Sequence, residues 1–300
     1  MTTLSKTERL KLFGSVEPSK KQKPTKKEDM KDLQNALADY LFSITQVGVS
    51  ELTLPVLLNS DTSPFKQAVQ ATFQVTSQLP RERKGVNMSR YVEKVTAYCK
   101  NEGSLDLSKL RLLIKEIAEY CELPTIAMKV QFRWFYDQIA PVTGLTGMNI
   151  ADGEIYLTYD PNAGYKQSVQ LEGTATTLCP CSKEISEYGA HNQRGHVKIQ
   201  AELPAHWDGD WKTPFLKIIE SNSSSPIYPI LKREDEKYVT EKAYENPRFV
   251  EDFVRLVAAE LCELPWVESF HVRCENDESI HLHKAYAEIK HTPSDRHQAF

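Results

Sequence analysis

A short segment in the second half of the chain places two cysteines close to two histidines. Cys179-Pro180-Cys181 follows a run of alternating, strand-like residues, and His191 and His196 come soon after it. Proline has no backbone N–H to donate to a neighbouring strand, so the strand is expected to end at Cys179, with both thiols at its end. Thiolates and imidazoles are nucleophiles and transition-metal ligands. Because buried cysteines also serve as small apolar residues, the pattern alone leaves a purely structural role open.

Composition limits the classes of protein that fit the chain. Its 300 residues are 40% hydrophobic and 26% charged, which allows one large domain or two ordinary ones. The formal net charge of −4 argues against general nucleic-acid binding. No apolar run reaches the length of a membrane helix, and the polar N-terminal region lacks a signal-peptide core. Six cysteines are few for this length and favour reduced thiols, so we expect a soluble, cytoplasmic protein without a membrane partner.

Hydrophobic periodicity predicts the same order of elements in both halves of the chain. In the first half, strands are predicted over 46–58, 65–79, 125–142 and 149–159, and helices over 89–100 and 107–123. In the second half, strands are predicted over 166–178, 195–202, 266–274 and 281–290, and helices over 211–221 and 247–262. The clearest helix has an apolar stripe through Leu110, Ile114 and Ile117. A two-fold repeat of β-β-α-α-β-β follows from this order.

The cysteine and histidine segment also carries a family resemblance. The run 179–184, Cys-Pro-Cys-Ser-Lys-Glu, together with the run 189–194, Gly-Ala-His-Asn-Gln-Arg, closely resembles the signature of type IB GTP cyclohydrolases. The resemblance spans nearly the whole chain. It implies an α+β fold of tandem tunnelling-fold (T-fold) modules, each a four-stranded antiparallel sheet with two helices on one face.

The resemblance gives the chain an expected organisation. Residues 1–30, rich in lysine and proline, are expected to form a flexible N-terminal arm, 31–163 the first module, and 164–300 the second module with most metal and catalytic residues. The family assembles as a homo-oligomer, expected to be a tetramer, with active sites where modules or subunits meet. Such an assembly would cover the exposed sheet edges.

A divalent metal is implied by the resemblance. Cys179 and His191 bracket a loop, and the family places the third ligand at Glu236, in the acidic run 233–237. One thiolate, one imidazole and one carboxylate leave a fourth position for water, as catalytic metal sites require. Because the donors mix soft and hard character, zinc, manganese and iron(II) are all acceptable. Without the resemblance, a solvated acidic run and a surface histidine are the simpler interpretation.

The implied reaction converts GTP and water to 7,8-dihydroneopterin triphosphate and formate, the first step of tetrahydrofolate biosynthesis. The metal lowers the pKa of its water, which then attacks the imidazole carbon of guanine. Proton transfer needs a histidine that titrates near neutrality, and the resemblance assigns His281 to it, with Glu278 and Cys181 in the same catalytic site. His283 is the alternative histidine. Both histidines also fit an exposed edge strand.

Substrate-binding residues are expected at three places. By resemblance to T-fold enzymes, Glu251 anchors the guanine amide and amine, in a helix that Asn246 is expected to cap and Pro247 to open. An acidic residue in a first helical turn is also favoured by the helix dipole alone. The basic residues nominated for the triphosphate are Lys84, Arg90, Lys183 and Arg194. The cluster 81–90 fits a solvated loop equally well.

Other functions compete with this interpretation. A T-fold nitrile reductase of queuosine biosynthesis would use Cys179 or Cys181 as a nucleophile and NADPH as hydride donor. His191 and Glu236 argue against it, because a reductase does not need them as ligands. A non-catalytic metal- or thiol-binding module, and a cyclohydrolase whose product is a cyclic phosphate, also remain open.

Overall fold

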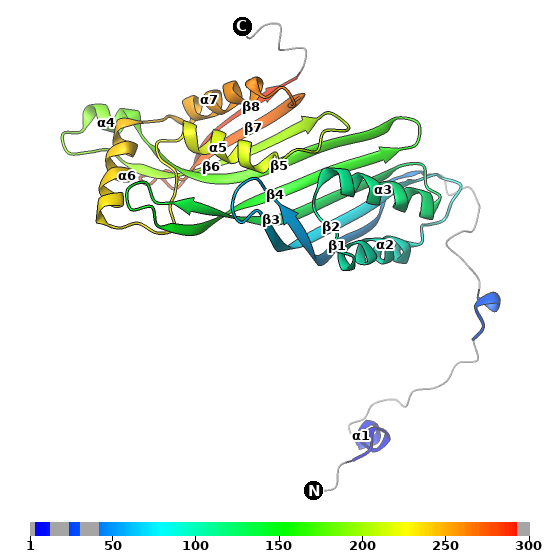
Figure 1. The fold of residues 1–300 in the computed structure, drawn as a ribbon. Helices are drawn as coiled ribbons and strands as arrows, with labels where there is room; N and C mark the ends of the chain where they lie inside the picture. Colours follow the sequence, from blue (N-terminus) through cyan, green and yellow to red (C-terminus); the bar gives the residue numbers. More distant parts are fainter. Residues whose placement is uncertain (1–3, 13–23, 31–41, 293–300) are drawn as a thin grey trace.

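The computed structural model describes residues 4–12, 24–30 and 42–292, and its centre is one eight-stranded antiparallel sheet in the order β1 to β8 (Figure 1). Neighbouring strands in the sheet are also neighbours in sequence. The strands are β1 (Ile44–Asn59), β2 (Lys66–Leu79), β3 (Ile126–Ile139), β4 (Thr146–Asp160), β5 (Gly164–Leu178), β6 (Asn192–Leu203), β7 (Ser269–Asn276) and β8 (Ala285–His291). Of the expected arm, residues 1–3 and 13–23 lie outside the described residues.

The expectation of tandem modules, each built on its own four-stranded sheet, was wrong. β4 and β5 pair in continuous register from Asp152 opposite Glu172 to Asp160 opposite Gly164, so the two halves share one sheet. Gly164 makes the tight turn between them with a positive φ of 79°. Alternating residues identify strands but not their partners, and an unpaired β4 edge would have left a row of backbone groups without hydrogen bonds. The tandem T-fold assignment is therefore replaced by a single eight-stranded sheet.

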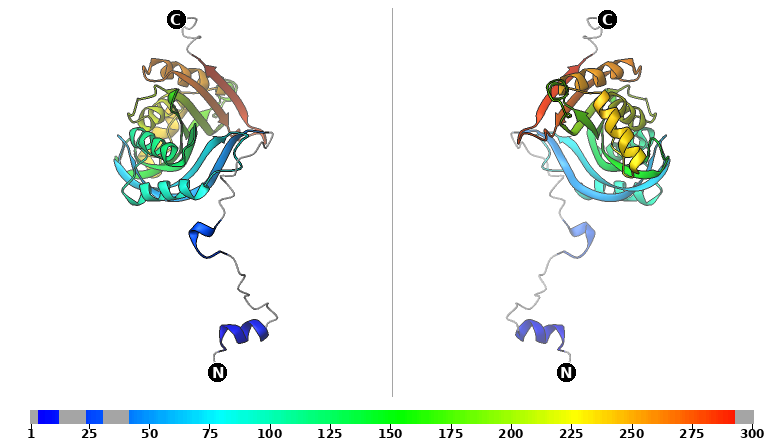
Figure 2. Two further views of the ribbon diagram at one scale, coloured as in Figure 1. Left: turned by 90° about the vertical axis from the view of Figure 1, so that its right-hand side faces the viewer. Right: turned by 90° about the vertical axis from the view of Figure 1, so that its left-hand side faces the viewer.

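Four helices cover one face of this sheet, as Figures 1 and 2 show. They are α2 (Met88–Lys100), α3 (Leu107–Cys121), α5 (Lys212–Asn222) and α7 (Val250–Glu263). Two further helices, α4 (Pro180–Ile185) and α6 (Arg233–Glu245), lie at one end of the sheet, and α1 (Lys6–Leu12) and a 3-10 turn (Lys27–Asp29) precede β1. None of the helices in the described part of the chain is long and apolar enough to span a membrane.

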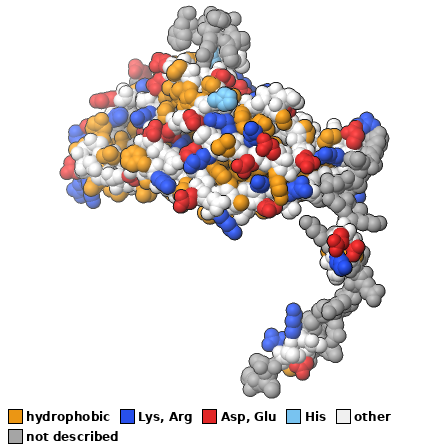
Figure 3. Space-filling model, turned by 45° about the vertical axis from the view of Figure 1, so that its right-hand side comes forward, with side chains coloured by type: hydrophobic (Ala, Val, Ile, Leu, Met, Phe, Trp, Pro, Cys, Tyr) orange, Lys and Arg blue, Asp and Glu red, His pale blue; other side chains and the backbone are white. Residues whose placement is uncertain are grey.

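The core lies between the sheet and these helices. Alternate residues of β3 and β6, such as Met128, Val130 and Ile199, are fully buried against stripes that include Ile114 of α3 and Phe253 of α7. The opposite face of the sheet carries charged pairs, among them Lys129–Glu154 and Lys198–Glu172. On the surface drawn in Figure 3, acidic and basic side chains are interspersed.

Most predicted elements are confirmed within a few residues, but one helix was not predicted and two expectations were wrong. The helix that was not predicted is α6, which begins in the acidic run 233–237. Asn246 ends α6, and α7 begins at Val250 with Phe249 as its N-cap, so Asn246 and Pro247 do not open α7. The strand expected from 281 starts at Ala285, and residues 277–284 form a loop.

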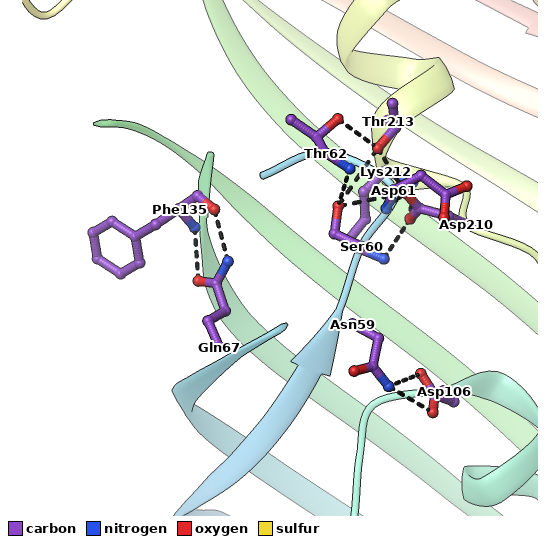
Figure 4. Close-up of polar contacts among 10 residues, drawn as sticks. All are labelled: Asn59, Ser60, Asp61, Thr62, Gln67, Asp106, Phe135, Asp210, Lys212 and Thr213. Atoms are coloured by element: carbon purple, nitrogen blue, oxygen red, sulfur yellow. Dashed lines mark hydrogen bonds and ion pairs between the residues drawn. The ribbon is translucent and has the colours of Figure 1, made fainter. Parts of the chain in front are cut away.

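A buried ion pair ties the β1–β2 loop to the start of α5 (Figure 4). The Asp210 carboxylate accepts from Lys212 Nζ at 2.5 Å, from Thr213 Oγ1 at 2.6 Å and from the Asp61 N–H at 2.9 Å. The Asp210 and Lys212 side chains are 7% and 6% exposed. Burial raises the pKa of the Asp210 carboxyl, but the Lys212 charge and the hydrogen bonds outweigh burial and lower it overall.

Asp210→Ala should destabilise the protein by about 3–5 kcal/mol, because it leaves the Lys212 ammonium buried without a partner. Urea unfolding at neutral pH measures the loss, and Asp208→Ala, which removes an exposed carboxylate nearby, is the control. The pKa of Asp210 in the folded protein is lowered from 3.8. The loss of unfolding free energy in Asp210→Ala should therefore be complete above pH 3.8 and should shrink as the pH falls through the lowered pKa. A loss below about 1 kcal/mol at neutral pH would contradict this account.

Candidate functional site

The ends of β5 and β6 bring Cys179 and His191 together. The last ladder pair is Leu178 opposite Asn192, and the Cys179 N–H extends the ladder by donating to the His191 carbonyl at 3.1 Å. Residues directly opposite in an antiparallel pair project to the same face, with Cβ atoms about 4.5–5.5 Å apart. The thiol and the imidazole therefore lie on the same face at this end of the sheet.

Ser182 fixes the backbone around this pair. Its hydroxyl donates to the Cys179 carbonyl at 3.1 Å and accepts from the His191 N–H at 3.2 Å, and its own N–H donates to the Cys179 Sγ at 3.4 Å. Cys179 is the N-cap of α4, and Pro180 stands at the first helical position, where a missing N–H costs nothing. Cys181, one residue into α4, is exposed.

The His191 ring has two polar neighbours. Its Nδ1 lies 3.0 Å from Gln193 Oε1 and 3.6 Å from Glu278 Oε2. The Gln193 amide nitrogen donates to Thr177 Oγ1 at 3.1 Å. The His191 and Glu278 side chains are only 16% and 14% exposed. A thiol, an imidazole and a carboxylate thus lie at this end of the sheet, and Gln193 is a participant that the sequence motif contained but that carried no predicted role.

The β7–β8 loop brings Glu278 to the site through its neighbour Asp277. The Asp277 N–H donates to the Arg194 carbonyl at 2.8 Å, and its carboxylate lies 3.0 Å from His196 Nε2 and 2.8 Å from Lys284 Nζ. The bonds from Lys284 and His196 lower the pKa of Asp277. Two of these three partners, Arg194 and His196, belong to β6, so the position of Glu278 depends on tertiary contacts.

His281 and His283 lie in the same loop and are exposed. Their rings stack with centroids 4.7 Å apart, and the His281 N–H donates to the Glu278 carbonyl at 3.3 Å. The strand expected from 281 begins later, at Ala285, so both histidines lie in the loop before it. His281 is consequently one turn from Glu278, while the apolar Ile280 and Leu282 are 62% and fully exposed respectively.

Residues of α6 and α7 border the site. The Arg248 N–H donates to the Leu178 carbonyl at 2.9 Å, so the segment that leads into α7 and Glu251 lies beside the end of β5. Lys183 Nζ donates to the Tyr244 carbonyl at 2.6 Å and lies over the Tyr244 ring at 4.5 Å, which ties α4 to α6.

Glu236 is exposed on α6, one turn before Val239. Val239 lines a cavity of about 410 Å³ together with Gln193 and Arg194. Among the described residues, no group of three or more His, Cys, Asp or Glu side chains lies close enough to hold a metal ion.

Two nominated phosphate ligands, Lys84 and Arg90, lie far from Cys179. Arg90 lines a cavity of about 290 Å³ with Arg83, between the start of α2 and the end of α3. Strand registers place Leu79, just before this region, near the level of Tyr165 at the start of β5. Leu178 is thirteen positions after Tyr165 in β5, a distance of about 43 Å at roughly 3.3 Å per residue. The structure therefore does not bring these two residues to the Cys179 site within one chain.

The thiols should differ sharply in reactivity. Burial raises the pKa of Cys99 to about 11 and that of Cys274 to about 12, whereas Cys181 is exposed. Because the thiolate is the nucleophile, iodoacetamide at about pH 8 should label Cys181 first and Cys274 only after unfolding. Peptide mass spectrometry over time measures the order, and labelling in urea is the control. Equal rates at Cys181 and Cys274 in the folded protein would contradict the structure.

Comparisons of sequence and of structure relate the chain to known proteins. Residues 30–287 match the family model described as type I GTP cyclohydrolase folE2. The chain is 47% identical over 292 residues to GTP cyclohydrolase FolE2 of Oceanobacillus iheyensis, covering 96% of this chain and 97% of that protein. It is 48% identical over 286 residues to GTP cyclohydrolase FolE2 of Bacillus subtilis, with 95% and 94% covered. The crystal structure of uricase from Arthrobacter globiformis superposes with a TM-score of 0.49 at 10% identity, covering 84% of this chain and 94% of that one.

Proposed function

Because this chain belongs to the type I GTP cyclohydrolase FolE2 family, we propose that Cys179, His191 and Glu236 hold the divalent metal with which it hydrolyses GTP. The chain is a GTP cyclohydrolase of folate biosynthesis. The expected products are 7,8-dihydroneopterin triphosphate and formate. The observation that carries the residue assignment is the backbone hydrogen bond from Cys179 to His191, one position beyond the β5–β6 ladder. Family membership also favours this activity over the nitrile reductase and the non-catalytic module.

The proposal rests on the types of donor atom, which suit a catalytic metal. The Cys179 thiol and the His191 imidazole share one face at the ladder's end, and both backbones are fixed by Ser182. Glu236 is the proposed third donor, supported by its place one turn before Val239, which lines a cavity with Gln193. A bound divalent cation would supply a polarised water for attack on the purine ring. A thiolate with a carboxylate leaves zinc, manganese and iron(II) as candidates.

Proton transfer is assigned to Glu278 and His281. Glu278 is held beside His191 and is largely shielded from solvent, which gives its carboxylate a defined position next to the ring. His281 lies one turn from Glu278 in the same loop and is exposed, so its imidazole is accessible to a bound substrate. Cys181, exposed on α4, is proposed to belong to the same site.

Guanine recognition is assigned to Glu251. It lies in the first turn of α7, whose approach is hydrogen-bonded to the end of β5. A carboxylate there can accept from the amide N–H and the exocyclic amine of guanine together. The helix dipole also favours an anionic side chain at this position.

Single substitutions should separate metal binding from proton transfer. Cys179→Ala, His191→Ala and Glu236→Ala should lose most bound metal and turnover while the fold is retained. Glu278→Ala and His281→Ala should keep the metal but lose turnover by about 10²–10⁴-fold. Metal content is measured by mass spectrometry, and turnover by the fluorescence of the oxidised pterin formed from GTP. Glu234→Ala, an exposed carboxylate on the same helix, is the matched control for Glu236. Full metal content in Glu236→Ala would reject Glu236 as a ligand.

The triphosphate is proposed to be bound by two copies of the chain. Arg194 belongs to the Cys179 end of the sheet, and Lys183 is engaged with Tyr244 there. Lys84 and Arg90 lie at the other end, so they can reach a triphosphate at Cys179 only from a neighbouring subunit. This requirement supports a homo-oligomer, which we propose to be a tetramer.

A complementation experiment tests the shared site. Cys179→Ala and the double variant Lys84→Ala, Arg90→Ala should each be inactive alone. Co-expressed with different tags and purified through both tags, the mixed oligomer should regain activity at least about tenfold above either parent, because some sites then combine two intact halves. Mixed oligomers without restored activity would show that each chain uses only its own residues.

A further inference from the structure

Thr177, Gln193, Cys179 and His191 form a column of two adjacent cross-strand pairs. Thr177 lies opposite Gln193 in the β5–β6 ladder, and Cys179 lies opposite His191 at the next position on the same face. Gln193 is two residues from His191 along β6, so both side chains project to the same side of the sheet. Thr177 is fully buried and Gln193 is 8% exposed. The hydrogen bond between them gives a partner to both the Thr177 hydroxyl and the Gln193 amide nitrogen.

The hydrogen bonds give the Gln193 amide one orientation. Its Nε2 donates to Thr177 Oγ1 at 3.1 Å, which turns its Oε1 toward His191 Nδ1 at 3.0 Å. An amide oxygen can only accept, so the Nδ1 of a neutral His191 must carry the ring proton. The other ring nitrogen, Nε2, then has a free lone pair.

Glu278 does not accept the hydrogen bond from the His191 Nδ1–H in the structure. Its Oε2 lies 3.6 Å from His191 Nδ1, beyond the distance of a normal hydrogen bond, whereas Gln193 Oε1 lies within it. Gln193 is thus the hydrogen-bond acceptor for the ring, and the Glu278 carboxyl group is not used to orient it.

We propose that Gln193 is a positioning residue that holds His191 as the Nδ1–H tautomer and presents Nε2 to the metal. The inference rests on the proposed metal site at Cys179 and His191. Histidine ligands in proteins donate their second ring N–H to an oxygen acceptor, and loss of that acceptor typically weakens metal affinity 10–100-fold. Here the acceptor is a buried amide, itself fixed by a buried threonine, in the strand that carries the ligand.

The test compares Gln193→Leu, which removes the acceptor at similar size, with Gln193→Glu, which keeps an acceptor in place. Competition with a chromophoric chelator measures the Kd of the protein for Zn²⁺ and Co²⁺ without turnover. Gln193→Leu should bind about 10–100-fold more weakly, and Gln193→Glu should stay within about threefold of the parent. Gln200→Leu, an exposed glutamine of the same strand, is the matched control and should match the parent. Urea unfolding of the metal-free proteins checks that all variants fold.

Each outcome supports or overturns the inference. Parent-like affinity in Gln193→Leu would overturn it, and so would an equal loss in Gln193→Glu. Nitrogen-15 NMR of metal-free protein labelled at histidine, with His191→Ala for assignment, should show the Nδ1–H tautomer. An Nε2–H tautomer would overturn the inference, because the Gln193 amide would then be reversed. Cys179→Ala tests the metal site itself. If that variant keeps full metal affinity, the proposed metal site fails; if it loses the metal and Gln193→Leu does not, only the role of Gln193 fails.

Discussion

The antiparallel pairing of β5 with β6 sets the geometry on which the candidate site depends. The ladder runs from Gln167 opposite Leu203 to Leu178 opposite Asn192, and one further backbone bond adds the Cys179–His191 pair. A shift of one residue in this register would turn every side chain of one strand to the other face. Cys179 and His191 would then face opposite sides of the sheet. The buried apolar residues along both strands, such as Leu171 and Ile199, oppose such a shift because it would expose them.

The same sheet joins both halves of the chain, and further contacts lock them together. Arg111 of α3, 8% exposed, donates to Gln167 Oε1 at 2.9 Å and to the Trp207 carbonyl at 3.0 Å. Gln167 is the first residue of β5 that pairs with β6, and Trp207 precedes α5. Arg111, a residue of the first half, thus supports the strand that leads to the site. With the Asp210 cluster at the β1–β2 loop, these contacts make the first half part of the support for β5.

Sequence periodicity could predict elements but not their partners. The stripe through Leu110, Ile114 and Ile117 predicted α3 because a helix that covers a sheet needs one apolar face. Helix α6 buries only Asp235 and Ala243 and has no such stripe. It is attached by Asp235, which accepts from the Val142 and Thr143 N–H groups of the β3–β4 turn, each at 2.9 Å. A bond between residues so distant in sequence leaves no local pattern.

The motif from 179 to 194 was informative because local rules control it. A proline after a strand predicted that the thiols lie at its mouth, and β5 ends at Leu178. The pairing of Cys179 with His191 follows once the two strands are adjacent. Gln193 was visible in the motif, but its role depends on the buried Thr177 across the ladder, and spacing alone does not reveal that contact. The place of Glu278 depends likewise on Asp277, which is held by His196 and Lys284.

The proposed site therefore combines two kinds of support. Cys179 and His191 are held by ladder bonds and by Ser182, so their donor atoms are arranged before any ligand binds. Of the groups proposed for proton transfer, Glu278 is shielded beside the anchored Asp277, whereas His281 lies on the exposed part of the loop 277–284. A metal site needs fixed distances, whereas proton transfer at several stages of ring opening and closure needs a group that can meet different atoms. Placing the first on strands and the second on a loop satisfies both requirements within one end of the sheet.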